Sequence, residues 1–293
     1  MTWVIFALLA PFTWAFVNLI DRFVMLRVVR TPFAPAFAYS IVGLVGSFLI
    51  YSYFGFEYSS ASHITLAIIV GVLNLISSIL YLYAAQREEI SRIVPLLYFV
   101  PLFVSVFAAV FLNEVFSVWK YLGIALLIMG AILVTHRSGK LRVSRAFWFM
   151  LMSALFWAAS SVLEKYLVQT NNVWTVYGWV RIGAGLGAPI LGVIVWKELK
   201  LVVKTHGSSR LVLMGVNESV SITAQLFLFF ALSLGPVSLV SSLGLVQSFF
   251  VLLLTLVVGI WYPKLLEEEM TTRVVLQKVV ATVLMFFGAF LVV

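Results

Sequence analysis

Cysteine is absent from this sequence of 293 residues, which excludes disulfides, thiolate metal ligands and cysteine nucleophiles. Charge is scarce as well, because only 10% of the residues are charged, against roughly 25% in soluble domains. A chain with so little polar surface indicates an integral membrane protein. The histidines His63, His136 and His206 are far apart, and no catalytic or metal-binding motif is present. We therefore expect no enzyme active site, no metal and no cofactor.

Apolar residues are abundant, at 63% of the chain, and they form long runs. A helix that spans a bilayer needs about 20 mostly apolar residues. Ten segments meet this requirement, which predicts an all-α integral membrane protein of the cell membrane with ten transmembrane helices. The segments are residues 3–20, 34–54, 64–84, 93–113, 118–135, 147–168, 174–196, 211–234, 236–260 and 274–293. The gaps between them are too short for a nucleotide-binding domain, so any transport would run on gradients.

The net charge of +8 comes from basic residues in the gaps between these segments. In a membrane protein such residues are topology signals, so we expect no nucleic-acid partner. If the chain crosses at every segment, 16 of the 19 Lys and Arg residues fall on one face, and the positive-inside rule then predicts both termini outside. The residues on that face are Arg22, Arg27, Arg30, Arg87, Arg92, Arg137, Lys140, Arg142, Arg145, Lys197, Lys200, Lys204, Arg210, Lys264, Arg273 and Lys278.

One nine-residue pattern occurs twice in the chain. It consists of Trp-Ala, five further residues, an acid and a base, at Trp14–Arg22 and again at Trp157–Lys165, 143 positions later (157 − 14 = 143). The repeat divides the chain into residues 1–140 and 141–293, each with five predicted spans. Because five is odd, the second copy enters the membrane in the opposite direction. This predicts two inverted five-helix repeats, an arrangement common in secondary transporters, with the substrate site between them.

The end of the first half resembles a known domain. Phe111-Leu112-Asn113-Glu114 and the glycine-spaced helix Trp119–Gly130 are similar to the end of an EamA domain of the drug/metabolite transporter (DMT) superfamily. In the second half Phe249-Phe250 and Gly288 occupy matching places, although Glu267-Glu268-Glu269 stands where the first half has one glutamate. The resemblance implies a small-molecule transporter with two EamA-like repeats. It also implies cytoplasmic termini. The distribution of Lys and Arg predicts the opposite orientation, and we keep that prediction.

Ionisable residues inside a span are costly, at about 2.5–3.5 kcal/mol for Arg, Lys or Asp, and therefore point to function. Glu218 and Arg181 are the clearest cases. Glu218 shares a helix face with Ser221 and Gln225, and Asn217 precedes it. This stripe predicts the wall of a water-lined cavity in which Glu218 binds a cation, an amine or a proton. The alternative is a structural ion pair between Glu218 and Arg181, or a polar contact that holds helices together.

The other candidate substrate-binding residues are polar or aromatic side chains of further spans. We interpret the two tryptophans of the repeat either as cavity walls or as anchors at the membrane interface. The pairs Asp21-Arg22 and Glu164-Lys165 are interpreted as the points where two helices leave the hydrocarbon. The complete candidate set is Trp14, Asn18, Asn74, Ser78, Tyr98, Trp157, Ser161, Arg181, Asn217, Glu218, Ser221, Gln225 and Gln247.

These observations favour a secondary transporter, an exporter of small polar or amphipathic metabolites such as amino acids, that works by alternating access. Its expected partners are the small-molecule substrate, the lipid bilayer and, as a hypothesis, a coupling proton or ion. Two alternatives stay open, namely a multi-span enzyme acting on lipid-linked substrates and a non-transporting scaffold subunit. The sequence does not distinguish a monomer from a homodimer.

Overall fold

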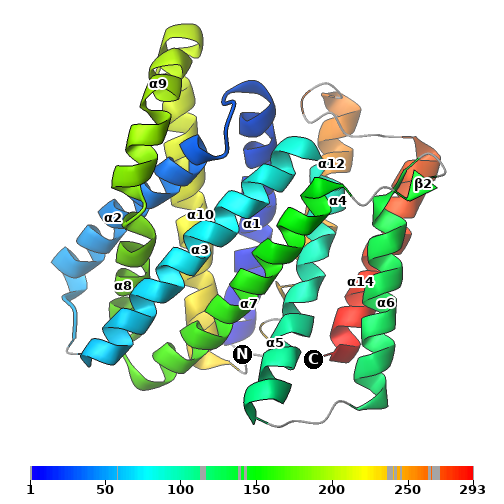
Figure 1. The fold of residues 1–293 in the computed structure, drawn as a ribbon, viewed down its shortest axis with the longest axis horizontal. Coiled ribbons are helices and arrows are strands. Elements are labelled where there is room, and N and C mark those ends of the chain that lie inside the picture. The colour runs from blue at the N-terminus through cyan, green and yellow to red at the C-terminus, as the bar shows by residue number, and fades with distance from the viewer. Residues whose placement is uncertain are drawn as a thin grey trace.

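The computed structural model describes residues 2–57, 59–112, 117–137, 140–141, 144–235, 240, 243–244, 246–262, 265 and 271–292. Almost all of this part of the chain is helical, as predicted (Figure 1). A helix pairs every backbone N–H and C=O within one segment, which hydrocarbon requires because it offers no partner of its own. Glu114 and Glu267–Glu269, which the sequence singled out, lie outside the described residues.

The first half of the chain consists of α1 (Thr2–Arg27), α2 (Phe33–Phe54), α3 (Ala61–Arg87), α4 (Ile90–Ile93), the 3-10 helix η1 (Val94–Tyr98), α5 (Phe99–Leu112) and α6 (Val118–Thr135). The segment expected as a single helix at 93–113 therefore begins irregularly. Pro95 lies in η1 and lacks the N–H that a regular helix would use. A small antiparallel hairpin of β1 (His136–Arg137) and β2 (Lys140–Leu141) follows α6.

The second half consists of α7 (Arg145–Thr170), α8 (Val173–Gly185), α9 (Ala188–His206), α10 (Ser209–Leu234), α12 (Gln247–Trp261) and α14 (Thr272–Val292). The span expected at 174–196 is broken, since α8 and α9 meet at an angle of 49°. Pro189 explains the break, because it has no N–H to donate to the carbonyl of Gly185 one turn earlier.

Six helices of the described chain are long and apolar enough to cross a membrane, namely α1, α2, α3, α7, α10 and α14. The bent pair of α8 and α9 is a seventh if it is counted as one span. Shorter apolar helices run over Ile90–Val104, Val118–Gly130 and Gln247–Trp261. The chain is therefore an α-helical integral membrane protein, and α1 extends to Arg27, well beyond residue 20 where the first span was expected to end.

Helices from the two halves of the chain pack against one another. α3 lies along α7, α1 along α10, α2 along α8 and α6 along α14 (Figure 1). The contact between α3 and α8 is especially close, because a Cβ added to Gly71 would lie 2.1 Å from the carbonyl oxygen of Val180. A Cβ on Gly183 would likewise lie 2.2 Å from the carbonyl oxygen of Ile68. Glycine at both positions lets the two backbones touch, as small residues do between membrane helices.

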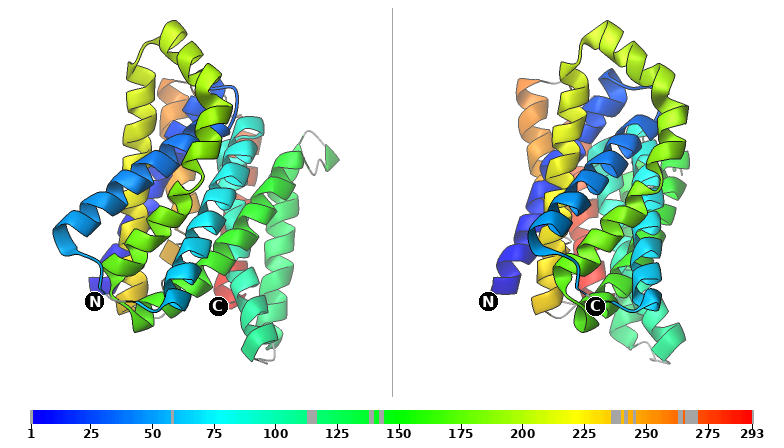
Figure 2. Two further views of the ribbon diagram at one scale, coloured as in Figure 1. Left: turned by 60° about the vertical axis from the view of Figure 1, so that its left-hand side comes forward. Right: turned by 90° about the vertical axis from the view of Figure 1, so that its left-hand side faces the viewer.

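Different elements lie at the two ends of the bundle. The start of α1 and the end of α14 lie at one end, whereas α9 and the hairpin lie at the other (Figure 2). The second end carries the connection between α1 and α2, which is tied to α9. The Glu198 carboxylate accepts hydrogen bonds from the N–H of Arg30, from the N–H of Thr31 at 3.0 Å and from the Thr31 hydroxyl at 2.6 Å.

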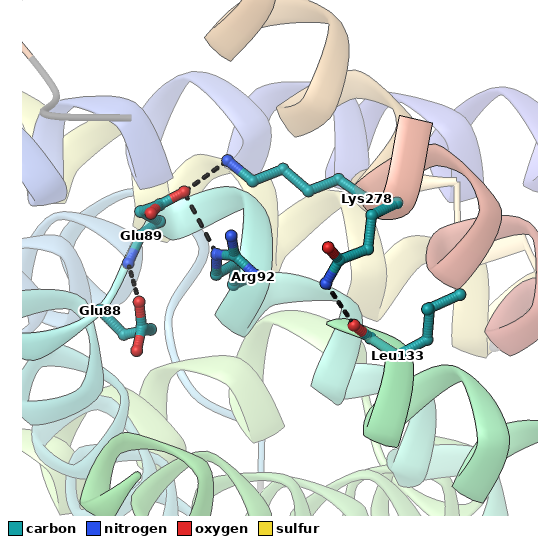
Figure 3. Close-up of polar contacts among 6 residues, drawn as sticks. Glu88, Glu89, Arg92, Leu133 and Lys278 are labelled. Atoms are coloured by element: carbon teal, nitrogen blue, oxygen red, sulfur yellow. Dashed lines mark hydrogen bonds and ion pairs between the residues drawn. The ribbon is translucent and has the colours of Figure 1, made fainter. Parts of the chain in front are cut away.

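Some basic residues that the sequence placed at the surface are buried instead. Lys278 is 2% exposed and Arg92 is 4% exposed. Both bind the carboxylate of Glu89, which lies 3.3 Å from the Arg92 Nε (Figure 3). Arg22 is 5% exposed and donates a hydrogen bond of 2.6 Å to the carbonyl oxygen of Ala85. Each of these residues has an internal acceptor that offsets the cost of burying its charge, so its side chain is part of the helix packing.

Candidate functional site

A polar cavity of about 70 Å³ lies among α1, α3, α7, α10 and α12. One water molecule needs about 10–15 Å³ on this scale, so the cavity has room for several waters or for one small polar group. Its walls come from both halves of the chain. Among the residues predicted from the sequence, those that line it are Trp14, Asn18, Asn74, Ser78, Trp157, Glu218, Ser221, Gln225 and Gln247.

A second cavity of about 100 Å³ adjoins the first and has mostly apolar walls, including Val100 and Leu228. The predicted residues Tyr98 and Ser161 line this second cavity. Trp14 and Trp157 line both cavities. Their indole rings meet edge to face, with centroids 5.4 Å apart. The two tryptophans are therefore cavity walls at the meeting point of the two halves.

Asp21 belongs to the first cavity, although the sequence interpretation placed it where a helix leaves the membrane. It is only 5% exposed, and α1 continues past it. The side-chain amide of Asn217 donates a hydrogen bond of 2.7 Å to its Oδ1, and the Tyr81 hydroxyl lies beside it. The interpretation as a helix exit was wrong, because these donors from other helices make burial of the carboxyl tolerable.

Glu164, the repeat partner of Asp21, is buried in the same manner. It is 1% exposed and accepts a hydrogen bond of 2.9 Å from the side-chain amide of Asn74. The next residue, Lys165, donates to the carbonyl oxygens of Leu232 at 2.8 Å and Gly235 at 3.2 Å. These carbonyls lie at the C-terminal end of α10, where the helix leaves them without a partner. This acid and base are thus internal contacts and do not mark a helix exit.

A pattern in the sequence could have located both acids. Trp14, Asn18 and Asp21 follow one another at spacings of four and three residues, and so do Trp157, Ser161 and Glu164. Such spacings place side chains on one helix face. Trp14 and Trp157 line the cavities. Asp21 and Glu164 lie about two helical turns further along the same faces, so both acids were candidates for the same buried environment.

A chain of hydrogen bonds connects the cavity wall across three helices. The side-chain amide of Gln247 on α12 donates to Oδ1 of Asn18 on α1 at 2.7 Å. Asn18 in turn donates to the hydroxyl of Tyr81 on α3 at 2.8 Å. Since the Tyr81 hydroxyl lies beside Asp21, the chain ends at a buried carboxyl. A ligand that binds Asp21 would therefore be coupled to the packing of α12 against α1.

Arg181, which the sequence placed in the substrate site, lines neither cavity. It is fully buried, and its Nη1 donates to the hydroxyl of Tyr39 at 3.0 Å and to Oε1 of Gln225. The guanidinium carbon also lies 4.3 Å above the centre of the Tyr39 ring. Within the described chain no ion pair joins Arg181 to Glu218, so the structural ion pair considered from the sequence does not form. Asn217 does not line the cavity either, because its side-chain amide donates a hydrogen bond to Asp21.

The buried centre contains more acid than base. Asp21, Glu164 and Glu218 are carboxyls, whereas Arg181 is the guanidinium that adjoins them and Arg22 faces Ala85. The described residues include no group of three or more His, Cys, Asp or Glu placed to hold a metal ion. Two of these three acids, Asp21 and Glu218, line the first cavity.

The described chain is thus a helical integral membrane protein with a polar cavity between its two halves. Comparison with known families agrees with this class, because the profile of the EamA-like transporter family matches residues 1–136. Residues 1–136 are therefore similar to the EamA-like transporter family, whose members are membrane transporters of the drug/metabolite transporter superfamily.

Two further comparisons concern whole proteins. A search of curated proteins finds no match. Among solved structures, 28 chains match. One of them, a crystal structure of a protein, superposes with a TM-score of 0.63 over 99% of this chain and 96% of that chain, at 15% sequence identity. At this identity the likeness concerns the fold alone.

Proposed function

We propose that the protein is a secondary transporter of the cell membrane that exports a small polar or amphipathic metabolite through the central cavity. The observation that carries this proposal is the cavity itself, which lies between the two halves and is lined by the carboxyls of Asp21 and Glu218. Each carboxyl buried beside the cavity lowers stability, and a non-transporting scaffold subunit would not require such residues. Amino acids and related amines are the first candidates for the substrate, because the cavity offers acids and aromatic rings.

The transport mechanism that we propose rests on ten spans in two inverted repeats, residues 1–140 and 141–293. Two hydrogen bonds support this division. Asn217 donates to Asp21, and Asn74 donates to Glu164. The same offset relates the two asparagines (217 − 74 = 143) and the two acids (164 − 21 = 143). Each acid is therefore held by the asparagine of the opposite half, as expected for two copies related by a twofold axis.

The helix packing supports the same symmetry. An offset of 143 residues converts α1 into α7 and α3 into α10. It therefore converts the pair of α1 and α10 into the pair of α7 and α3, and both pairs are in contact. Alternating access would rock these two pairs about the shared cavity, so that it opens first to one side of the membrane and then to the other. From the basic residues that remain at the surface, we place both termini outside.

Filling the cavity is expected to stop transport. Ser221 lines the first cavity from α10, and replacing it by tryptophan puts a large ring into a space of about 70 Å³. We expect uptake of a panel of labelled amino acids and amines into proteoliposomes to fall at least about tenfold, because overpacking costs about 1–3 kcal/mol and a factor of ten is about 1.4 kcal/mol.

The matched control is Ser219→Trp, two residues earlier on the same helix, where the side chain is exposed. This variant should transport like the parent protein. Equal uptake by the parent protein and both variants would show that substrate does not pass through this cavity, and the absence of uptake of every compound by the parent protein would overturn the proposed function.

A further inference from the structure

We propose that the cavity binds the ammonium group of a small amine and selects amines over amino acids and carboxylic acids of the same size. This inference rests on the proposed function, because it names the substrate class of the same cavity. It follows from three observations: the placement of the acids, the placement of the arginine and the character of the adjoining second cavity.

The first observation is that the Glu218 carboxyl has no hydrogen-bond donor among the described residues. Its side chain is 5% exposed and lies in the cavity wall. No described residue donates a hydrogen bond to its carboxyl. Asp21, the second acid of the wall, lines the same cavity. A buried carboxylate without a hydrogen-bond donor is costly, and a cation placed between the two acids supplies the missing contact.

The second observation is that positive charge is kept out of the cavity. The described lining contains no lysine, arginine or histidine. Arg181, the nearest buried cation, does not line the cavity, and its Nη1 is hydrogen-bonded to Tyr39 and Gln225, which do. On its other side a Cβ added to Gly43 would lie 3.0 Å from its Nη2, so the guanidinium is enclosed.

A ligand carboxylate in this cavity would therefore meet two acids and no base. Of the uncharged donors, the amides of Asn18 and Gln247 are already engaged with each other and with Tyr81, and the hydroxyls of Ser78 and Ser221 carry no charge to balance a carboxylate. The ammonium group of an amino acid would favour binding, and its carboxylate would oppose binding. A simple amine has the favourable group alone. A ligand carboxylate buried without a donor would carry the desolvation cost of an unpaired charge.

The third observation concerns the remainder of the ligand. Trp14 and Trp157 line the wall, and an ammonium group close to an indole face gains about 0.5–2 kcal/mol in proteins. Both rings also belong to the second cavity, whose walls include Val100 and Leu228. The head group and the tail of one molecule can thus occupy adjoining spaces, with the ammonium group at the acids and a short hydrocarbon tail beyond the tryptophans.

The test uses three molecules with one hydrocarbon body: 3-methylbutylamine, leucine and 4-methylpentanoate. They carry an amine, an amine with a carboxylate, and a carboxylate. The proposal predicts that the amine stabilises the purified protein in a thermal-shift titration and that leucine needs a concentration at least about tenfold higher, with no effect of the acid. A preference for leucine or for the acid would overturn the inference.

Variants connect the effect to the site. Glu218→Gln and Asp21→Asn should each weaken the response to the amine at least about tenfold, because each removes a charge-assisted hydrogen bond. Glu57→Gln makes the same chemical change at an exposed position outside the cavity and should leave the response unchanged. If Glu218→Gln fails to fold, the thermal-shift response of Asp21→Asn to the amine is the test. An amine response that survives in a folded acid variant contradicts the proposal.

Binding and transport fail separately in this design. Uptake of leucine into proteoliposomes without binding of the amine would leave the transporter intact and overturn the preference for amines. Binding of the amine without uptake of any compound would support the site and overturn the proposed function.

Discussion

Replacing Arg181 by methionine is expected to lower the free energy of unfolding by about 3–5 kcal/mol. The methionine keeps most of the volume but removes the one guanidinium that adjoins the buried carboxyls. Arg181 is fully buried, and its charge acts on Glu218 and Glu164 through the protein interior. Both acids would lose their compensating charge, and Gln225 would lose its donor. Denaturant titration of the detergent-solubilised protein, followed by tryptophan fluorescence, measures the loss.

Two further variants separate charge from packing at this position. Arg181→Met combined with Glu164→Gln should recover part of the lost stability, because it removes one of the uncompensated acids. Lys204→Met makes a comparable change in the exposed part of α9 and should shift the stability by less than about 0.5 kcal/mol. If Arg181→Met is as stable as Lys204→Met, the guanidinium does not balance the buried acids.

The second large effect is expected at the ion cluster that joins the start of α4 to α14. Glu89→Gln is expected to cost about 3–5 kcal/mol, because it leaves the cations of Lys278 and Arg92 buried without their shared carboxylate. Glu89 is 3% exposed, so water cannot replace the lost charge (Figure 3). The midpoint of thermal unfolding in detergent, measured at matched protein concentration, reports the change.

A double variant tests whether charge is the cause. Glu89→Gln with Lys278→Met leaves one cation where there were two and should recover more than half of the loss. The exposed Glu57→Gln should be nearly neutral. A double variant that is no more stable than Glu89→Gln alone would mean that shape, and not charge, holds this end of the bundle together.

Much of the fold could be predicted from the sequence, because a long apolar segment in a bilayer forms a helix that pairs its own backbone groups. The segments predicted at 34–54 and 211–234 match α2 and α10 to within a few residues. The break between α8 and α9 was missed, because apolar composition continues through it and the cause is one proline next to glycines. A hydropathy pattern records whether residues favour lipid but does not record whether a helix bends.

The site could be predicted in part, because helical spacing groups residues that lie on one element. The stripe of Glu218, Ser221 and Gln225 was visible for this reason, and all three line the cavity. Asp21 was misinterpreted because the partner that keeps it buried, Asn217, lies 196 positions away along the chain. A charged residue at a helix end has the same appearance in a sequence whether it faces water or a donor from another helix.

The measurement that tests the account most directly is the accessibility of one cysteine. The protein contains no cysteine, so Ser78→Cys places a single thiol in the cavity wall without background. A membrane-impermeant maleimide should label it from either side of oriented proteoliposomes, because alternating access opens the cavity to each side in turn. Addition of 3-methylbutylamine should slow both reactions. Labelling from one side only, or at a rate that the amine does not change, would contradict the account.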